Sequence, residues 1–98
     1  MRPGNRRTAR ASPRIITPKD GVIYQRRLSD PEWSGIPLVA STDADASAVF
    51  WFVKDRFIGR GVPGEPLVWH PGDGAQMLRV VDNFGRAAMQ KIVVRTLP

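Results

Sequence analysis

Apolar residues in this chain recur at every second position, and Gly, Pro, Asp and Asn interrupt them about every 8–12 residues. Side chains on a strand alternate between two faces, so this pattern is typical of short, half-buried strands. No segment combines a helical apolar stripe with helix caps, and nine prolines each remove a backbone donor. We therefore expect an all-β sandwich or barrel with little or no helix, whose strands cover residues 14–17, 21–25, 36–42, 48–53, 56–60, 66–70, 75–82 and 86–95.

Two hairpin turns are predicted between these strands. Asp82-Asn83-Phe84-Gly85 is a strong turn signal, because Asp and Asn side chains cap the backbone and glycine accepts positive φ. The last two strands should therefore pair antiparallel. Lys54-Asp55 fits a two-residue type I′ turn poorly, so we expect that turn to be longer or strained.

Positive charge is concentrated at the N-terminus. The formal net charge is +6, and residues 1–14 hold five arginines and no acid, which leaves ten Lys and Arg against nine Asp and Glu in residues 15–98. A short Arg-rich segment with Pro, Gly and Ser buries too little apolar surface to fold. We expect a disordered basic linker at residues 1–13 and one folded module at residues 14–98. Binding of nucleic acid or an acidic polymer by the tail is the alternative, but the nearly neutral folded part argues against nucleic acid as a partner.

Few residues are available for metal, cofactor or catalytic chemistry. The chain has no cysteine and a single histidine, His70, so we expect no thiolate or transition-metal site. The run GRGVPG at residues 59–64 has the glycine spacing of a dinucleotide-binding loop, but a proline-bounded strand follows it instead of a helix. Asp43, Asp45 and Asp73 lack the spacing of a calcium loop and are better explained as turn residues. We therefore expect no metal, no cofactor and, because no apolar run reaches the roughly 20 residues of a span, no membrane crossing.

Three stretches resemble one known family. They are PRIITPKDGVIY at residues 13–24, FWFVKDRFIG at residues 50–59 and EPLVWHPGDGAQMLRVVDNFGRAA at residues 65–88. Together, in this order, they resemble the C-terminal module of bifunctional penicillin-binding proteins of the 1C type. The resemblance implies an immunoglobulin-like antiparallel β-sandwich of about seven strands, appended to a peptidoglycan glycosyltransferase and transpeptidase. It also implies a periplasmic location, with tethering to the inner membrane through the parent protein.

The catalytic motifs of such a parent do not occur in this chain. No serine is followed three residues later by lysine, and there is no K-T-G. We expect a non-catalytic interaction or positioning module that contacts the parent synthase domains or another cell-envelope protein. The alternative is a carbohydrate-binding module for peptidoglycan strands, in which Trp33 and Trp69 stack on sugars. In the competing interpretation both rings only cap the ends of the core.

The stretch AVFWFV at residues 48–53 places three aromatics in a row, so neighbours must point to opposite faces. In an immunoglobulin-like sandwich the central tryptophan of such a strand faces the core. Trp51 is therefore expected to share a core row with Val49, Val53, Leu78 and Val80. Phe50 and Phe52 then face outward, where residues 26–35 or the tail cover them, or where they meet another domain or protein.

Truncation of the aromatics tests this orientation. We expect Trp51→Ala to lower the free energy of unfolding by about 3–5 kcal/mol, the usual range for a large core aromatic. Phe52→Ala should have a mild effect, because its ring lies outside the core. Urea unfolding measures both variants. A large loss of stability in Phe52→Ala together with a small loss in Trp51→Ala would show that the assignment of the two faces is reversed.

Overall fold

The computed structural model describes residues 12–29 and 35–98, which form strands and no helix. The strands are β2 (Arg14–Thr17), β3 (Ile23–Arg27), β4 (Ile36–Ser41), β5 (Val49–Val53), β6 (Arg56–Gly61), β7 (Leu67–Trp69), β8 (Gly74–Asp82) and β9 (Ala87–Leu97). Trp33, nearly all of the predicted tail and the centre of the predicted 26–35 loop lie outside the described residues. Pro13 is buried, so the folded part includes at least this residue of the segment assigned to the tail. No helix in the described part is long and apolar enough for a membrane span.

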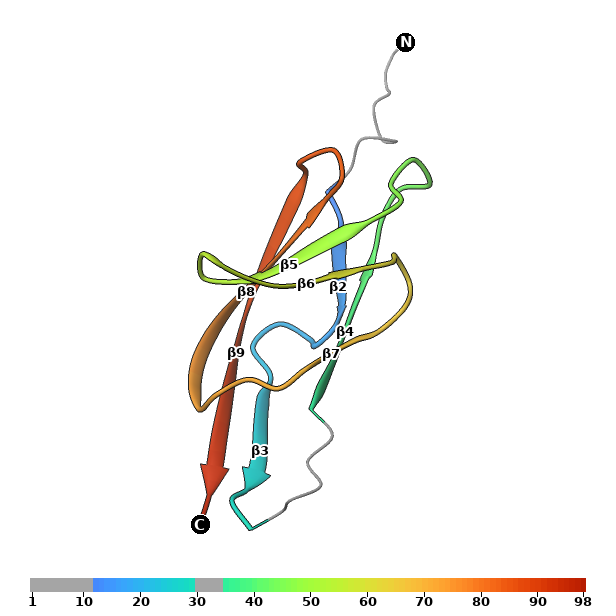
Figure 1. The fold of residues 1–98 in the computed structure, drawn as a ribbon. Helices are drawn as coiled ribbons and strands as arrows, with labels where there is room; N and C mark the ends of the chain where they lie inside the picture. The colour runs from blue at the N-terminus through green and yellow to red at the C-terminus, as the bar shows by residue number, and fades with distance from the viewer. Residues whose placement is uncertain (1–11, 30–34) are drawn as a thin grey trace.

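The strands form two sheets that pack face to face around one core (Figure 1). One sheet has the order β2-β4-β7, and the other has the order β3-β9-β8-β5-β6. All neighbouring pairs are antiparallel except β3 and β9, which run parallel and end side by side in Figure 1. The predicted immunoglobulin-like sandwich is confirmed, with eight strands in the described part in place of about seven.

The additional strand and the parallel pair have one cause, which is that the chain changes sheets near its N-terminus. β2 pairs with β4, whereas β3 follows a link at residues 18–22 and joins the other sheet beside β9. In this link Gly21 has a φ of 74°, and its N–H donates to the carbonyl of Lys91 at 2.9 Å. Regular pairing begins only at Ile23, so the strand predicted at residues 21–25 lies instead at residues 23–27.

The core lies between the two sheets and centres on Trp51. This side chain is 1% exposed, and Val49 and Val53 on either side of it are also buried. Across the sheet, Trp51 is opposite Val80 and Val53 is opposite Leu78, both fully buried. The three-stranded sheet contributes Ile36, Leu38, Ala40 and Trp69. One indole ring thus contacts an apolar layer that both sheets supply.

The glycine-spaced run at residues 59–64 belongs to β6 and the turn that follows it. Gly59 is the cross-strand partner of Trp51. A Cβ at Gly59 would come within 2.7 Å of Leu67 Cδ2, and one at Gly61 would lie 3.5 Å from Trp51 Nε1. The first distance is too short for a real Cβ, whereas the second is an ordinary contact, so Gly59 makes room for the Leu67 side chain and has a packing role.

The hairpin between β5 and β6 closes through a two-residue turn at Lys54 and Asp55, because Val53 pairs directly with Arg56. Lys54 has a φ of 54° and is the one non-glycine residue with positive φ in the described part of the chain. Positive φ at the first central position alone is the pattern of a type II′ turn, which prefers glycine there. The turn is therefore not longer than two residues, and its strain lies in the backbone of Lys54.

We expect Lys54→Gly to raise the free energy of unfolding by about 0.5–1 kcal/mol. Glycine removes the steric cost of a left-handed backbone, about 1–2 kcal/mol. Part of this gain is offset because glycine also increases the conformational entropy of the unfolded chain. Urea unfolding measures the change. Asp55→Gly is the matched control. It increases the entropy of the unfolded chain without relieving a positive φ, so it should destabilise the folded protein. Equal effects of the two variants would mean that Lys54 stores no strain.

The turn between β8 and β9 is held by the carboxylate of Asp82, as the DNFG pattern predicts. Asp82 is 2% exposed, and its Oδ1 accepts hydrogen bonds from the backbone N–H groups of Phe84 and Arg86 at 2.9 and 3.0 Å. Arg86 Nε donates to Asp82 Oδ2 at 2.7 Å, and a terminal nitrogen of Arg86 donates to Asp45 Oδ1 at 2.9 Å. The hydrogen bond with Asp45 is the main cause that raises the pKa of Arg86, so this guanidinium stays charged.

The same turn also holds the segment that leads into β5. Gly85 takes the positive φ that the pattern predicts, 85°. Asn83 Oδ1 accepts hydrogen bonds from the backbone N–H groups of Ser47 and Ala48 at 2.9 and 3.3 Å. The β8–β9 turn therefore positions the start of the strand that carries Trp51.

We expect Asp82→Ala to lower the free energy of unfolding by about 2–3 kcal/mol, because the backbone N–H groups of Phe84 and Arg86 lose a buried acceptor. Thermal or urea unfolding measures the loss. Glu65→Ala, which removes an exposed carboxylate from another turn, serves as the control and should change little. A neutral Asp82→Ala would contradict a structural role for the buried carboxylate.

Candidate interaction surface

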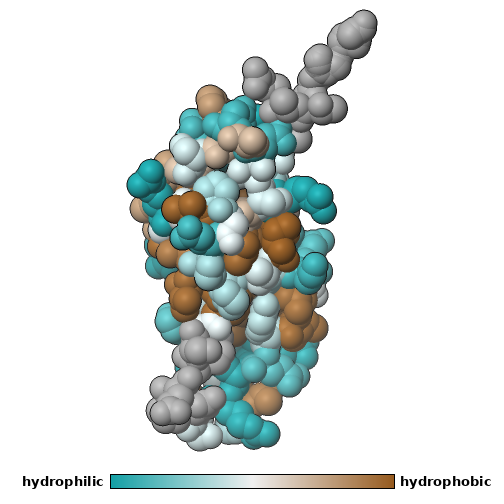
Figure 2. Space-filling model, turned by 90° about the vertical axis from the view of Figure 1, so that its right-hand side faces the viewer, coloured by the Kyte–Doolittle hydropathy of each residue, from teal (hydrophilic) through white to brown (hydrophobic). Residues whose placement is uncertain are grey.

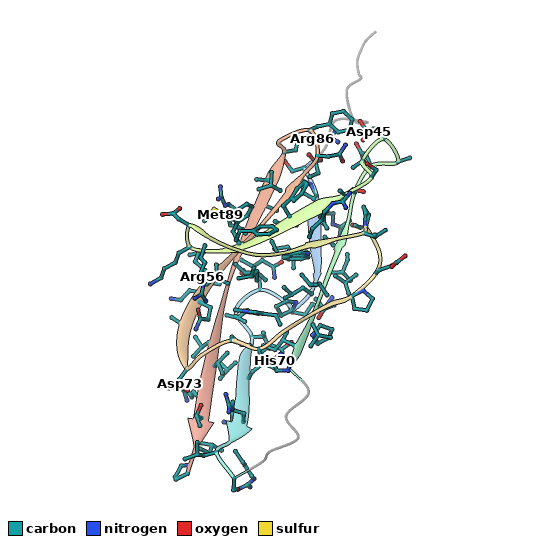
Figure 3. The ribbon with its side chains drawn as sticks, in the orientation of Figure 1. Asp45, Arg56, His70, Asp73, Arg86 and Met89 are labelled. Carbon is teal, nitrogen blue, oxygen red and sulfur yellow. The ribbon has the colours of Figure 1, made fainter. Side chains whose placement is uncertain are left out.

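The five-stranded sheet has an outer face that no described segment covers with a further layer. Phe50 and Phe52 alternate with the buried row of β5 and point to this side. The strand registers assign the other members, and Met89, labelled in Figure 3, marks the face on β9. We call the following set the outer face: Ile23, Gln25, Arg27, Phe50, Phe52, Phe57, Arg60, Ala75, Met77, Arg79, Val81, Ala87, Met89, Lys91, Val93, Arg95 and Leu97.

An aromatic cluster lies on the outer face around Phe52. Its ring meets the ring of Phe57 edge-on, with centroids 5.6 Å apart, and the guanidinium carbon of Arg79 lies 4.7 Å from its centroid. Phe52 is thus half-buried by neighbours on its own sheet, whereas Phe57 is 54% exposed. The segments expected to cover the two phenylalanines, residues 26–35 and the tail, lie largely outside the described residues.

A single row of side chains crosses the outer face from β6 to β9. Phe57 pairs with Phe52, Phe52 with Arg79, and Arg79 with Met89. Strands lie about 4.8 Å apart, so the row spans about 14 Å. Met89 is 58% exposed and Met77, two residues from Arg79 on the same strand, is 38% exposed. Aromatic, methionine and arginine side chains together are the composition of protein interfaces.

The outer face carries positive charge and no acid. Its cations are Arg27, Arg60, Arg79, Lys91 and Arg95. Among the described residues, the acidic side chains lie in turns and links or, like Asp82, on the inner side of a strand. Arg86 forms ion pairs with Asp45 and Asp82 at the β8–β9 turn, away from the row.

An open hollow of about 610 Å³ lies at the β5–β6 turn. Its lining residues are Val53, Lys54, Asp55, Arg56 and Gln76. Val53 lies opposite the buried Leu78 and Gln76 lies opposite the buried Ile92, so these side chains point to the inner side of the sheet. The hollow is therefore not part of the outer face.

Of the two tryptophans proposed as sugar platforms, the structure describes Trp69. Trp69 is 7% exposed and belongs to the core cluster, so its ring is not available for stacking and this expectation is wrong. Its position in β7 opposite Ile36 turns it inward, as the capping interpretation has it. Trp33 lies outside the described residues. Gln25 and Arg60, polar residues that a sugar site could use, lie on the two opposite edge strands of the five-stranded sheet and do not converge.

The remaining chemical candidates are scattered over the molecule. Figure 3 shows Asp45 beside Arg86 at one end and Asp73 toward the other, so the aspartates weighed as calcium ligands do not meet. Asp73 Oδ1 instead accepts the N–H of Thr96 at 2.6 Å. His70 is exposed next to the end of β7. No group of three or more possible metal ligands occurs within residues 12–29 and 35–98.

Most of the outer face was not recognised from the sequence. Phe50 and Phe52 were named, but Phe57, Arg79 and Met89 were not. Part of the signal is hairpin register: counting outward from the two turns pairs Phe52 with Phe57 and Arg79 with Met89. The β5–β8 register that joins these two pairs is long-range and is not available from the turns. Alternation within one strand does not show which residues of different strands become neighbours.

Comparison with solved structures supports the fold. The chain is similar to the fibronectin(III)-like modules of Clostridium thermocellum CbhA, with a TM-score of 0.65 and 17% sequence identity over 88% of this chain and 99% of that chain. At this identity the likeness concerns the fold alone. A comparison with curated proteins found no match.

Comparison with family models identifies the family of the chain. The model of the Penicillin-Binding Protein C-terminus Family matches residues 2–94, which include every described strand except the end of β9. The predicted resemblance to the C-terminal module of penicillin-binding proteins is therefore confirmed. The chain belongs to the Penicillin-Binding Protein C-terminus Family.

Proposed function

We propose that this chain is a non-catalytic module that positions its parent synthase through protein contact made by the outer face. The parent is a bifunctional peptidoglycan glycosyltransferase and transpeptidase, tethered to the inner membrane with the module in the periplasm. Membership of the penicillin-binding protein C-terminus family supports this setting. The absence of S-x-x-K and K-T-G from the sequence supports a role without catalysis.

The observation that carries the proposal is the exposure of large apolar side chains on one sheet face. Phe57, Met89 and Met77 are 54%, 58% and 38% exposed, and all three lie on the outer face. Contiguous exposed apolar surface marks sites of interaction, and buried aromatic anchors supply most of the energy of protein interfaces. Phe57 and Phe52, already packed against each other, are such anchors.

The opposite side of the sandwich has fewer features of a protein interface. Figure 2 views the molecule from the side on which Figure 1 draws β4 and β7, and its apolar surface is divided into separate patches by polar and neutral side chains. Val68 of β7 is 55% exposed there, but no aromatic contact or cation–π pair is found on β2, β4 or β7 in the described part of the chain. Glycan binding loses its main support because Trp69 is buried.

Site-specific cross-linking in the full-length protein tests this function. A photoreactive residue at Met89 should yield a covalent adduct with a protein in cells, because this exposed position belongs to the row that makes the proposed contact. Val68 is the matched control, since it is 55% exposed against 58% for Met89 but lies on the other sheet. The adduct at Met89 should be degraded by protease.

Two outcomes contradict the proposal. An adduct at Met89 that muramidase degrades and protease spares would replace protein contact with glycan contact. No adduct at Met89, or equal yields from Met89 and Val68, would exclude the outer face as a specific protein interface.

A further inference from the structure

The cations of the outer face have no partner charge in the described part of the chain. Arg60, Arg79 and Lys91 make no ion pair there, whereas Arg86 at the end of the sandwich makes two. An exposed cation loses little by remaining unpaired in water. Once a partner excludes water from the face, each uncompensated cation becomes costly unless a carboxylate or similar anion meets it.

The arrangement of the cations among apolar side chains is as informative as their sign. Arg79 lies between Phe52 and Met89 in the row across the sheet. Lys91 is opposite Met77, and Arg60 is opposite Phe50. A matching partner must therefore offer acidic and apolar side chains on the same face, and neither a purely acidic nor a purely apolar surface satisfies the whole row.

Charge also excludes two occupants that the chain itself could supply. A second copy packed face to face would bring the Arg79 and Lys91 of one copy against the cations of the other, because a two-fold contact joins the same patch on both subunits. Residues 1–11 hold four arginines and no acid, so the basic tail has the same sign as the face. Both contacts would be opposed by like-charge repulsion.

We infer that the outer face binds an acidic, amphipathic segment of another protein. Its apolar side chains pack on Phe52, Phe57 and Met89, and its carboxylates pair with Arg79 and Lys91. The row of about 14 Å matches four or five residues of extended chain. This inference rests on the proposed function, to which it adds the chemistry of the partner.

The test follows the methionine methyl groups of the 98-residue chain by NMR while a random copolymer of glutamate and tyrosine is added. Signals of Met77 and Met89 should shift and saturate, and the Trp69 indole signal should stay unchanged. Polyglutamate should bind about tenfold more weakly, because it lacks apolar side chains. Added salt should weaken both interactions by screening.

Paired variants separate charge on the face from charge elsewhere. Arg79→Gln combined with Lys91→Gln should weaken copolymer binding about tenfold. Arg14→Gln combined with Lys19→Gln removes the same charge from outside the five-stranded sheet and should leave the affinity within about twofold. Equal weakening by the two pairs would overturn the inference, because net charge alone would then explain binding.

Other outcomes assign the face differently. Shifts of Met77 and Met89 with phosphatidylglycerol vesicles but not with the copolymer would make it a membrane-binding surface and overturn the inference. Protein adducts from position 89 that persist in the Arg79→Gln/Lys91→Gln variant would keep protein contact but exclude an acidic partner. Absence of protein adducts from that position would contradict the proposed function itself.

Discussion

The burial of Trp51 between the two sheets sets the orientation of every strand around it. Side chains on a strand have a period of two, so a slip of one residue in β5 would move the indole into solvent and both flanking phenylalanines into the core. That cost holds the register of β5. Hydrogen-bonded pairing then transmits the same inward and outward assignment to β8 and β9, and so places Arg79 and Met89 beside Phe52.

Two turns hold this sheet, and they do so in different ways. The β8–β9 turn is satisfied by the buried carboxylate of Asp82, and Asn83 ties it to the segment before β5. The β5–β6 turn is strained at Lys54, which has a φ of 54°. Between them the outer face lies on paired strands, so its side chains are positioned before any partner arrives. Such preorganisation lowers the entropy lost on binding.

The fold of this module does not by itself specify what it contacts. A sandwich that is 17% identical superposes with a TM-score of 0.65, and folds of this kind host many unrelated roles. What distinguishes this chain is the surface on the five-stranded sheet, where Phe52, Phe57 and Met89 lie among cations with no acid. The positive charge of that surface would select for partners of negative charge.

Alternating apolar residues and turn signals determined the strands and the all-β class, because these depend on neighbours along the chain. The DNFG turn was recognised for the same reason. The sandwich and the inward direction of Trp51 followed from the resemblance to an immunoglobulin-like module. Only the tertiary structure decided that β3 runs parallel to β9, that Trp69 is buried and that Phe57, Phe52, Arg79 and Met89 form one row. Each of these depends on which strands become neighbours across a sheet or between sheets. Long-range pairing of this kind is the result of packing the whole chain around one core.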